Sequence, residues 1–156
     1  MFSIICAKGK NNEIGKNNSL PWHIKKDLKF FKEKTMNHTI VMGKNTYLSL
    51  PKNLKGRNII VISKTLVDDN VTIIRDPFEF IKDNIVSEEE IFICGGQKIY
   101  ELFLPFSKFL YITEVDLTVD ADAYFPYFNE EFYEKTILDS CSENNIKFDF
   151  IKYKIK

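Results

Sequence analysis

Short apolar runs that alternate with helix-forming segments are the feature of this sequence that most constrains its fold. Each run is too short for a helix and shows little alternation of apolar with polar residues, which is typical of a strand buried on both faces. The runs predict strands at residues 2–8, 39–43, 58–62, 71–74 and 91–94. Helices are predicted at about 24–37, 44–50, 77–84 and 97–104. Strands that alternate with helices favour a mostly parallel sheet covered on both faces.

Beyond residue 104 the pattern changes, because strands dominate the rest of the chain. We predict strands at 110–115, 132–138 and 146–155, and loops at 9–20 and 116–126. The fold class is therefore a three-layer α/β domain. Its central, mostly parallel mixed sheet has about eight strands with an antiparallel C-terminal edge, and about four helices flank it.

The last predicted strand contains a break in its period. Ile146, Phe148 and Phe150 alternate with polar residues, whereas Ile151 and Tyr153 continue on the opposite parity. A period-2 pattern that changes phase indicates a β-bulge, which we place near Phe150 and Ile151.

Charge and cysteine content narrow the classes of function. The 22 basic and 22 acidic residues balance, which argues against broad binding to nucleic acid or membrane surfaces. The N-terminal segment has the features of neither a signal peptide nor a membrane span. Cys6, Cys94 and Cys141 lie far apart, as expected of reduced thiols in a cytoplasmic protein, and with His23 and His38 they lack metal-site spacing. The chain shows no linker or repeat, so we expect one domain over residues 1–156.

Asp27 stands out among the acidic residues because of its place on the first predicted helix. A helix that begins near Ile24 places Leu28, Phe31 and Thr35 in one apolar stripe with it. Asp27 falls at the edge of this stripe, where a carboxylate is costly to bury without a partner or a role. The alternative is a partly exposed acid that favours the first helical turn.

Two predicted strands end in glycine and lead directly into helices, at Gly43-Lys44-Asn45-Thr46 and at Gly95-Gly96-Gln97-Lys98. Glycine lets a ligand approach the backbone, and the unpaired N–H groups that begin a helix favour an anion. The lysines add positive charge, so together these corners suit a pyrophosphate held from two sides. Each could instead be purely structural, since neither is a GxGxxG fingerprint or a Walker loop.

Several other positions allow two interpretations. Arg57 could clamp a carboxylate or be an ordinary surface arginine. Ser63 and Lys64 could form a basic cluster, while for Arg75 we favour a solvated surface charge. Trp22 is a core residue by type, but its loop-to-helix position suits a pocket wall. Nucleophilic catalysis has no support, because the sequence lacks a GxSxG elbow.

Taken together, these motifs resemble dihydrofolate reductase of the short bacterial type over nearly the whole chain. They occur in order and almost without gaps: Ile14-Gly15 with Leu20-Pro21-Trp22, Asp27-Leu28 with Phe31, Met42-Gly43-Lys44-Asn45-Thr46, Leu54 with Gly56-Arg57, Gly95-Gly96 with Tyr100, and Thr113 with Asp122 to Pro126. Each motif is weak alone, whereas the set is highly specific. The resemblance implies NADPH-dependent reduction of 7,8-dihydrofolate to 5,6,7,8-tetrahydrofolate by a cytoplasmic, monomeric enzyme that also binds antifolates.

The resemblance also implies a substrate site. Asp27 is expected to bind the pterin ring and to promote protonation at N5, directly or through water held by Trp22, while hydride goes to C6. Burial should raise its pKa, and Thr113 should hydrogen-bond it. The other expected site residues are the carbonyls of Ile5 and Cys94 at the pterin edge, Phe31, Leu50 and Leu54 around the p-aminobenzoyl ring, Leu28 beside them, Arg57 on the glutamate α-carboxylate, and Leu20 and Tyr100 in the catalytic group.

The cofactor site follows from the same resemblance, with no metal. The loop of residues 9–23 is expected to close over the nicotinamide, and the Gly95–Gly96 peptide is expected to be cis. The residues implied are Ala7, Ile14 and Tyr100 near the nicotinamide, Lys44, Asn45, Thr46, Gly96, Gln97 and Lys98 at the pyrophosphate, and Lys44, Ser63 and Lys64 around the 2′-phosphate. Further cofactor-binding residues are Gly15, Lys16, Gly43, Gly95 and Ile99.

Some positions depart from the family pattern. Lys44 stands where arginine is frequent and Lys64 where a small polar residue is common, so positive charge is kept and NADPH preference should survive. Cys94 replaces Ile or Val, which makes the pocket floor smaller and softer. Leu20 is often Met, and Ala121 stands where Gly is common, which bears on loop closure.

Two other functions stay open at this point. A reductase of another heterocycle, such as the pyrimidine reductase of riboflavin synthesis, would share the fold but gives no reason for Asp27, Phe31 and Arg57 to occur together. A non-catalytic α/β binding module would oxidise no NADPH with any pterin.

Overall fold

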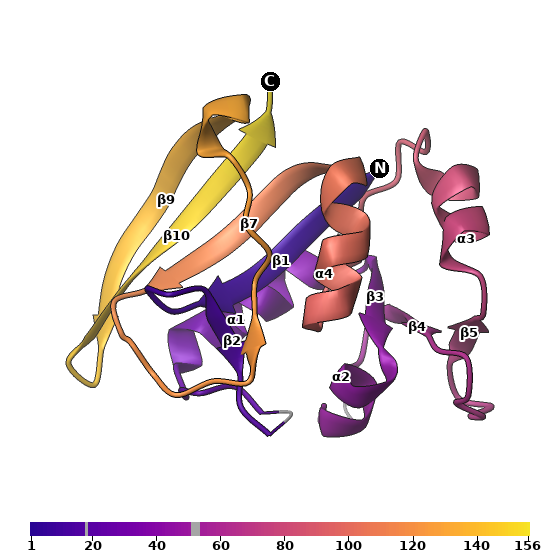
Figure 1. Cartoon of the computed structure of the whole chain (residues 1–156), viewed down its shortest axis with the longest axis horizontal. Coiled ribbons are helices and arrows are strands. Elements are labelled where there is room, and N and C mark those ends of the chain that lie inside the picture. The colour runs from indigo at the N-terminus through magenta and orange to yellow at the C-terminus, as the bar shows by residue number, and fades with distance from the viewer. Residues whose placement is uncertain (18, 51–53) are drawn as a thin grey trace.

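The computed structural model describes residues 1–17, 19–50 and 54–156, and its main element is an eight-stranded sheet (Figure 1). The strand order is β5-β4-β3-β6-β1-β7-β10-β9. The strands are β1 Phe2–Lys8, β3 Thr39–Gly43, β4 Asn58–Ile62, β5 Thr72–Ile74, β6 Ile91–Ile93, β7 Ser107–Val115, β9 Tyr133–Glu143 and β10 Ile146–Ile155. The helices are α1 Lys25–Thr35, α2 Lys44–Ser49, α3 Pro77–Asn84 and α4 Gln97–Phe103, with 3-10 helices at Leu104–Phe106 and Glu130–Phe132.

The direction of pairing agrees with the sequence prediction. β1 pairs in parallel with β6 and β7, and β3 pairs in parallel with β4 and β6. β10 runs antiparallel to both β7 and β9, so the antiparallel edge is C-terminal. The predicted fold class, a mostly parallel mixed sheet flanked by four helices, is confirmed.

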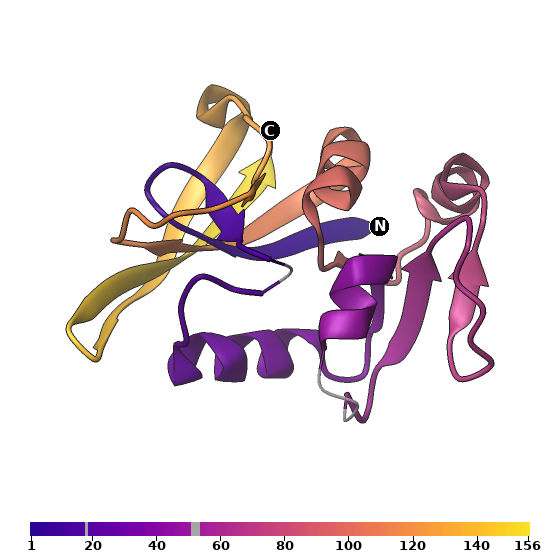
Figure 2. The same cartoon turned by 60° about the horizontal axis from the view of Figure 1, so that its bottom comes forward.

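Alternating side chains of β1 divide the core into two layers. Ile4 and Cys6 join Tyr100 and Phe103 of α4 on one face of the sheet. Ile5 points to the other face, where α1 and α2 cover the sheet. Figure 2 shows α1 and α4 on opposite sides of the strands. The side chains that β1 directs toward α1 therefore lie on the face where Asp27 is expected.

The buried face of α1 differs from the predicted stripe. Phe30 stacks on Phe150 of β10 with ring centroids 4.3 Å apart, while Leu28 is 46% exposed. Ile24 and Thr35 are buried, as predicted. Because Phe30 lies inward and Leu28 outward, the face that meets the sheet is centred on Asp27 rather than ending there.

The predicted bulge is confirmed, and its extra residue belongs to the neighbouring strand. The register between β10 and β9 shifts between Phe150 and Ile151, whose partners are Asp139 and Ile137. The residue left over is Leu138 of β9. Phe150 lies in the core beneath α1, and Ile151 lies in the core on the α4 side, which accounts for the change of phase.

Two strands lie in segments that the sequence predicts as loops. β2 Glu13–Gly15 pairs with β8 Ala123–Tyr124 in a separate two-stranded sheet. Strands this short leave no periodic pattern, because a few hydrogen bonds from distant residues define them. β9 also runs to Glu143, beyond the predicted end at 138, because an exposed edge strand carries polar residues that hide its pattern.

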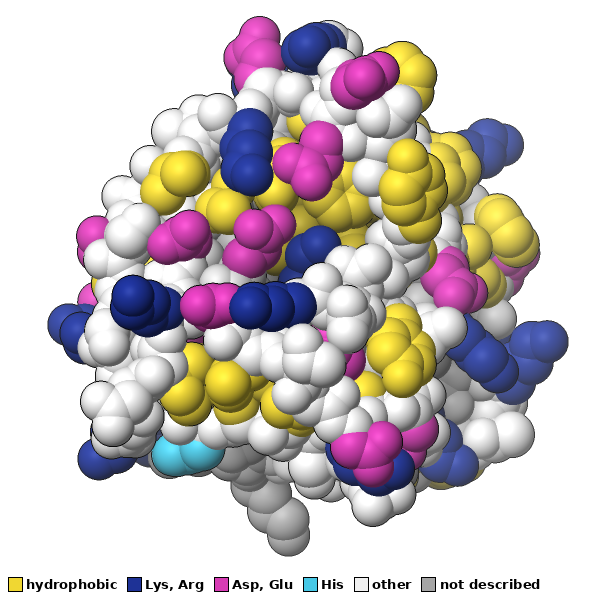
Figure 3. Space-filling model, turned by 60° about the vertical axis from the view of Figure 1, so that its left-hand side comes forward, with side chains coloured by type: hydrophobic (Ala, Val, Ile, Leu, Met, Phe, Trp, Pro, Cys, Tyr) yellow, Lys and Arg dark blue, Asp and Glu magenta, His cyan; other side chains and the backbone are white. Residues whose placement is uncertain are grey.

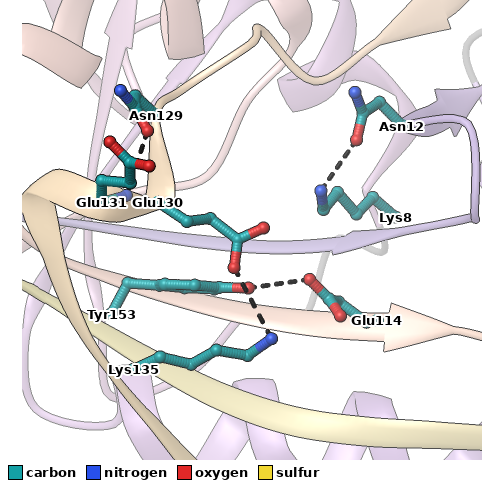
Figure 4. A network of polar contacts seen from close by, with 8 residues as sticks. All are labelled: Lys8, Asn12, Glu114, Asn129, Glu130, Glu131, Lys135 and Tyr153. Carbon is teal, nitrogen blue, oxygen red and sulfur yellow. Dashed lines mark hydrogen bonds and ion pairs between the residues drawn. The ribbon is translucent and has the colours of Figure 1, made fainter.

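Polar contacts fix the end of β1 where the chain enters the loop of residues 9–20 (Figure 4). Lys8 Nζ donates to Asn12 Oδ1 at 2.7 Å, and the Tyr153 hydroxyl nearby donates to Glu114 at 2.9 Å.

A hollow of about 620 Å³ lies beside these contacts, and lysines and carboxylates surround its hydrophobic floor (Figure 3). Its charges largely balance, and none of the predicted site residues lines it.

None of the helices in the described ranges is long and apolar enough to cross a membrane.

Candidate functional site

Asp27 lies on the first turn of α1 and points at the sheet. The hydroxyl of Thr113, a buried residue of β7, donates to Asp27 Oδ1 at 2.7 Å. Burial raises the pKa of Asp27, and the hydrogen bond from Thr113 opposes that change in part. The pairing and the raised pKa both agree with the expectation from the resemblance, and they leave this carboxyl able to hold a proton more readily than a free aspartate.

The central strands bring the other expected pterin contacts next to this pair. Register places Ala7 of β1 opposite Thr113 of β7, so the two share a face of the sheet. The Ile5 carbonyl, two residues back, accepts a 2.8 Å hydrogen bond from the Tyr100 hydroxyl. Tyr100 is buried, which raises its pKa well above the ordinary value. Burial also raises the pKa of the Cys94 thiol, so this residue is a neutral part of the site.

Among the described residues, two buried side-chain nitrogens have no hydrogen-bond partner within the protein: Trp22 Nε1 and Arg57 Nε. Trp22 packs with Phe148 and Phe150, and Arg57 donates through Nη1 to Thr35 Oγ1 at 3.4 Å. Buried donors are normally satisfied, so these two nitrogens, unpartnered among the described residues, are available to a ligand or a water. The resemblance places both residues at the substrate site.

Several of the apolar residues expected at the substrate site pack against one core cluster. Phe31, Leu50 and Leu54 all pack, half-buried, against the core beneath α1 and α2. Leu28 stands exposed beside them on α1. Their role as a wall for the substrate stays a prediction, and the adjoining residues 51–53 lie outside the described ranges. Leu20 is 50% exposed at the end of the loop that precedes Trp22.

The two glycine corners meet, as the sequence predicts. The Gly43 N–H donates to the Gly95 carbonyl at 2.9 Å, and the Gly95–Gly96 peptide is cis. A Cβ on Gly96 would lie 3.6 Å from Thr46 Oγ1, and one on Gly43 would lie 3.3 Å from Ile99. A side chain at Gly43 would therefore crowd Ile99, while one at Gly96 would make an ordinary contact with Thr46.

The basic cluster beside the first corner is also assembled. Lys44 Nζ donates to Thr65 Oγ1 at 3.3 Å, which places it against the turn formed by Ser63 and Lys64. Ser63 Oγ accepts from the N–H groups of Thr65 and Leu66, which fixes that turn. Thr65 is missed by sequence reasoning because a loop residue after a strand has no distinguishing pattern.

Arg75 is more than the solvated surface charge that the sequence favours. Its guanidinium donates to the carbonyls of Ser63 at 2.9 Å and Leu66 at 2.7 Å. It therefore holds the turn that carries Ser63 and Lys64, from the end of the neighbouring strand β5.

The second corner is tied to β8 by a predicted ligand residue. Gln97 Oε1 accepts from the Tyr124 N–H at 2.9 Å, and its amide nitrogen donates to Glu101. The Gln97 side chain is thus engaged within the protein, and its backbone N–H remains the group that faces a ligand. Lys98 and Asn45 are exposed at the starts of their helices.

Residues 10–17 dock on the segment 116–124. Asp122 makes two hydrogen bonds in this contact. Its backbone N–H donates to the Gly15 carbonyl, and its carboxylate accepts from the Asn17 N–H. Lys16 pairs with Asp120 at 3.0 Å, and Ile14 packs on the core below α4. Ala121, where the family pattern departs, lies inside this docking segment.

Glu13 is a buried acid that sequence reasoning missed. Its two carboxylate oxygens accept from the N–H groups of Asn11 at 2.6 Å and Val119 at 2.8 Å. Burial by itself would raise the pKa of Glu13, but these hydrogen bonds outweigh it and the pKa is lowered. A Cβ on Gly9 would lie 2.8 Å from this carboxylate. The sequence indicates this buried acid only through a glycine, Gly9, four residues before Glu13.

In the part of the chain that the structure describes, no group of His, Cys, Asp and Glu side chains is arranged to hold a metal ion.

Comparisons with known proteins agree with this geometry. The sequence model of the family "Dihydrofolate reductase" matches residues 1–155. The dihydrofolate reductase of Haemophilus influenzae is 35% identical over 133 residues, which cover 85% of this chain and 83% of that protein. That of Buchnera aphidicola subsp. Acyrthosiphon pisum is 39% identical over 148 residues, with 92% and 90% covered. A solved structure of the Enterococcus faecalis enzyme with NADP(H) and RAB-propyl has a TM-score of 0.89 and 28% identity, and covers 100% of this chain and 96% of that one.

Proposed function

We propose that Asp27, Arg57 and the two glycine corners carry the activity of this chain, which belongs to the dihydrofolate reductase family. The chain is an oxidoreductase that reduces 7,8-dihydrofolate to 5,6,7,8-tetrahydrofolate with NADPH. The observation that carries the assignment of residues is the half-buried Asp27 carboxyl, 2.7 Å from the Thr113 hydroxyl and with a raised pKa.

Asp27 is the group that binds the flat pterin ring and promotes protonation at N5. A carboxyl with a raised pKa holds a proton more readily than an ordinary aspartate and can return it. It would accept hydrogen bonds from the 2-amino group and N3 of the ring. Trp22 Nε1, which has no partner among the described residues, would donate to a water at the start of α1, and that water would give the proton a second route.

Arg57 and the apolar wall select the rest of the substrate. Phe31, Leu50 and Leu54 present one hydrophobic surface, which suits the p-aminobenzoyl ring. The buried Arg57 Nε has no hydrogen-bond partner among the residues that the structure describes, and a guanidinium binds a carboxylate in a bidentate geometry. Arg57 therefore holds the glutamate α-carboxylate.

The residues at the glycine corners fit NADPH. The backbone is open at Gly43 and Gly96, where a Cβ would meet Ile99 and Thr46. Backbone N–H groups there would take the pyrophosphate, and Lys44 with Ser63 and Lys64 would take the 2′-phosphate. When bound, NADPH supplies the hydride for pterin C6.

The docked loop of residues 9–20 excludes water from the reacting atoms. Its contacts with Asp120 and Asp122 hold Ile14 to Lys16 in place at the nicotinamide. Exclusion of water strengthens the charge interactions of Asp27 and protects the reduced carbon from side reactions.

We further propose that the enzyme is a cytoplasmic monomer of one domain that binds no nucleic acid. The balanced charge of the chain supports the last point. Size-exclusion chromatography with light scattering tests the oligomeric state, and a dimeric mass would overturn it.

Mixing the purified protein with NADPH and dihydrofolate tests the assignment directly. Absorbance at the nicotinamide band should fall with dihydrofolate and not with a ribityl-pyrimidine substrate. Asp27→Asn should lose most turnover at neutral pH while NADPH binding, measured by fluorescence, stays near the parent value. Near-normal turnover of this variant would exclude Asp27 as the group that promotes protonation.

A further inference from the structure

The helix that carries Asp27 has no N-terminal cap of its own. Its N-cap residue is Ile24, and in the described structure no side chain from its own first turn bonds the free N–H groups. Instead, the N–H groups of Lys25 and Lys26 donate to the two carboxylate oxygens of Glu143, at 2.7 and 3.1 Å. Glu143 ends β9 and lies 118 residues further along the chain than Lys25.

The contact continues beyond the carboxylate. Lys26 Nζ donates to the Ser142 carbonyl at 3.3 Å, so the β9–β10 hairpin grips the backbone and a side chain of the same turn. The first N–H groups of a helix have no internal partner, and a carboxylate there is favoured by the helix dipole. The hydrogen bond from Lys25 lowers the pKa of Glu143, so this cap stays ionised at neutral pH.

The N-cap residue Ile24 is buried in a cluster with Trp22 and Phe150, so packing at Ile24 and the Glu143 carboxylate together anchor the start of α1. The side chains of Lys25, Lys26 and Leu28 are exposed, and the aromatic packing that holds the helix begins one turn later, at Phe30. Asp27 follows directly after the two capped residues. The direction in which its carboxyl points is thus set by Thr113 at the side-chain end and by Glu143 at the backbone end.

We propose that Glu143 is a positioning residue for the reaction, which fixes the turn that carries Asp27 by capping α1 from the hairpin tip. The proposal rests on the proposed role of Asp27 in binding and protonating the pterin ring. It makes the β9–β10 hairpin, far from the cofactor corners, part of the machinery that orients the substrate.

Replacement of the cap tests this inference. Glu143→Ala should raise KM for dihydrofolate and lower kcat, together by about fivefold in kcat/KM, the effect of losing one helix cap. KM for NADPH should not change. Glu143→Gln, which keeps an acceptor oxygen, should recover part of the loss. Glu134→Ala is the matched control, because Glu134 is an exposed acid on the same strand away from α1.

Hydrogen exchange of the Lys25 and Lys26 amides gives a readout independent of activity. Exchange should accelerate in Glu143→Ala and not in Glu134→Ala. If Glu143→Ala lowers the melting temperature but leaves kcat and KM for dihydrofolate at the parent values, the cap is only structural and the inference is wrong. Equal changes in KM for both ligands would also contradict it.

A double-variant cycle separates this inference from the proposed function. In an Asp27→Asn background, Glu143→Ala should have almost no further effect on the residual rate, because Glu143 acts through Asp27. The same fivefold loss in that background would overturn the positioning role while leaving Asp27 in place. Full activity of Asp27→Asn alone would overturn both assignments.

Discussion

The Thr113 hydroxyl donates a 2.7 Å hydrogen bond to the Asp27 carboxylate, and this bond opposes the effect of burial on the pKa of Asp27. Burial pushes the pKa of Asp27 up from its ordinary value, and the hydrogen bond from Thr113 favours the ionised form. The pKa of Asp27 is therefore held between two limits. If it were too high, the carboxyl would not bind the ring as an anion, and if it were too low, the carboxyl would not promote protonation.

Thr113→Val should remove the restraint on the Asp27 pKa without changing side-chain shape. The pKa of Asp27 should rise further, so the pH–rate profile should move toward higher pH. At neutral pH the lost bond to a charged acceptor should lower stability by about 1–2 kcal/mol, measured by urea denaturation. Thr136→Val on the exposed β9 is the control. A profile that stays in place would show that Thr113 does not act on the reacting carboxyl.

Arg57→Ala should weaken substrate binding far more than cofactor binding. Truncation of one partner in a hydrogen-bonded charge pair is expected to raise KM for dihydrofolate about 100-fold, with little change in Kd for NADPH. Arg75→Ala is the matched control, because this arginine supports the turn of Ser63 and Lys64. Arg75→Ala should weaken the binding of NADPH and leave the binding of dihydrofolate unchanged. The same response from both variants would make Arg57 a structural arginine.

Lys44→Ala tests the basis of cofactor choice. Lys44 contacts Thr65 in the exposed basic cluster, where its charge should favour the 2′-phosphate. Loss of that charge should weaken NADPH binding about tenfold and leave NADH binding nearly unchanged, as measured by fluorescence titration at two salt concentrations. Lys98→Ala provides the comparison at the other corner, since it should weaken the binding of NADPH and NADH equally. Equal losses for NADPH and NADH in Lys44→Ala would exclude a 2′-phosphate role.

The sequence predicts those parts of the fold that leave a local compositional mark. Strands buried on both faces, such as β1 and β3, are continuous apolar runs, so their limits are close to the observed ones. Phe150 and Ile151 mark the bulge because burial changes face between them. β2 and β8 have no such mark, since they are defined by hydrogen bonds between distant segments.

The same reasoning separates the site residues that can be predicted from those that cannot. Asp27 is detectable because helical periodicity places a carboxyl on an apolar face. Glu13 and Glu143 are not, because their partners are backbone N–H groups, some of them more than 100 residues away, and a backbone donor has no residue type to recognise. Arg75 is misjudged for a similar reason, since it binds two carbonyls.

The buried Glu13 should link the stability of the docked loop to pH. Its folded pKa is lowered below the ordinary value of 4.5. The carboxylate therefore contributes stability that is present above the unfolded pKa and is lost as pH falls through the folded pKa. Glu13→Gln turns an amide N–H₂ toward the donors of Asn11 or Val119 and should cost about 2 kcal/mol at neutral pH. The gap between parent and variant should close in acid, because the parent then protonates as well.

Urea denaturation at about pH 7 and at successively lower pH values follows the Glu13 effect as the carboxylate of the parent protein protonates. Glu131→Gln, at an exposed acid, should show no gap at any of these pH values. Because Glu13 joins the loop of residues 9–20 to Val119, kcat of Glu13→Gln should also fall at neutral pH while Kd for dihydrofolate changes little. A stability gap that persists undiminished in acid would mean that the Glu13 charge does not hold the two segments together, and that packing around Gly9 does.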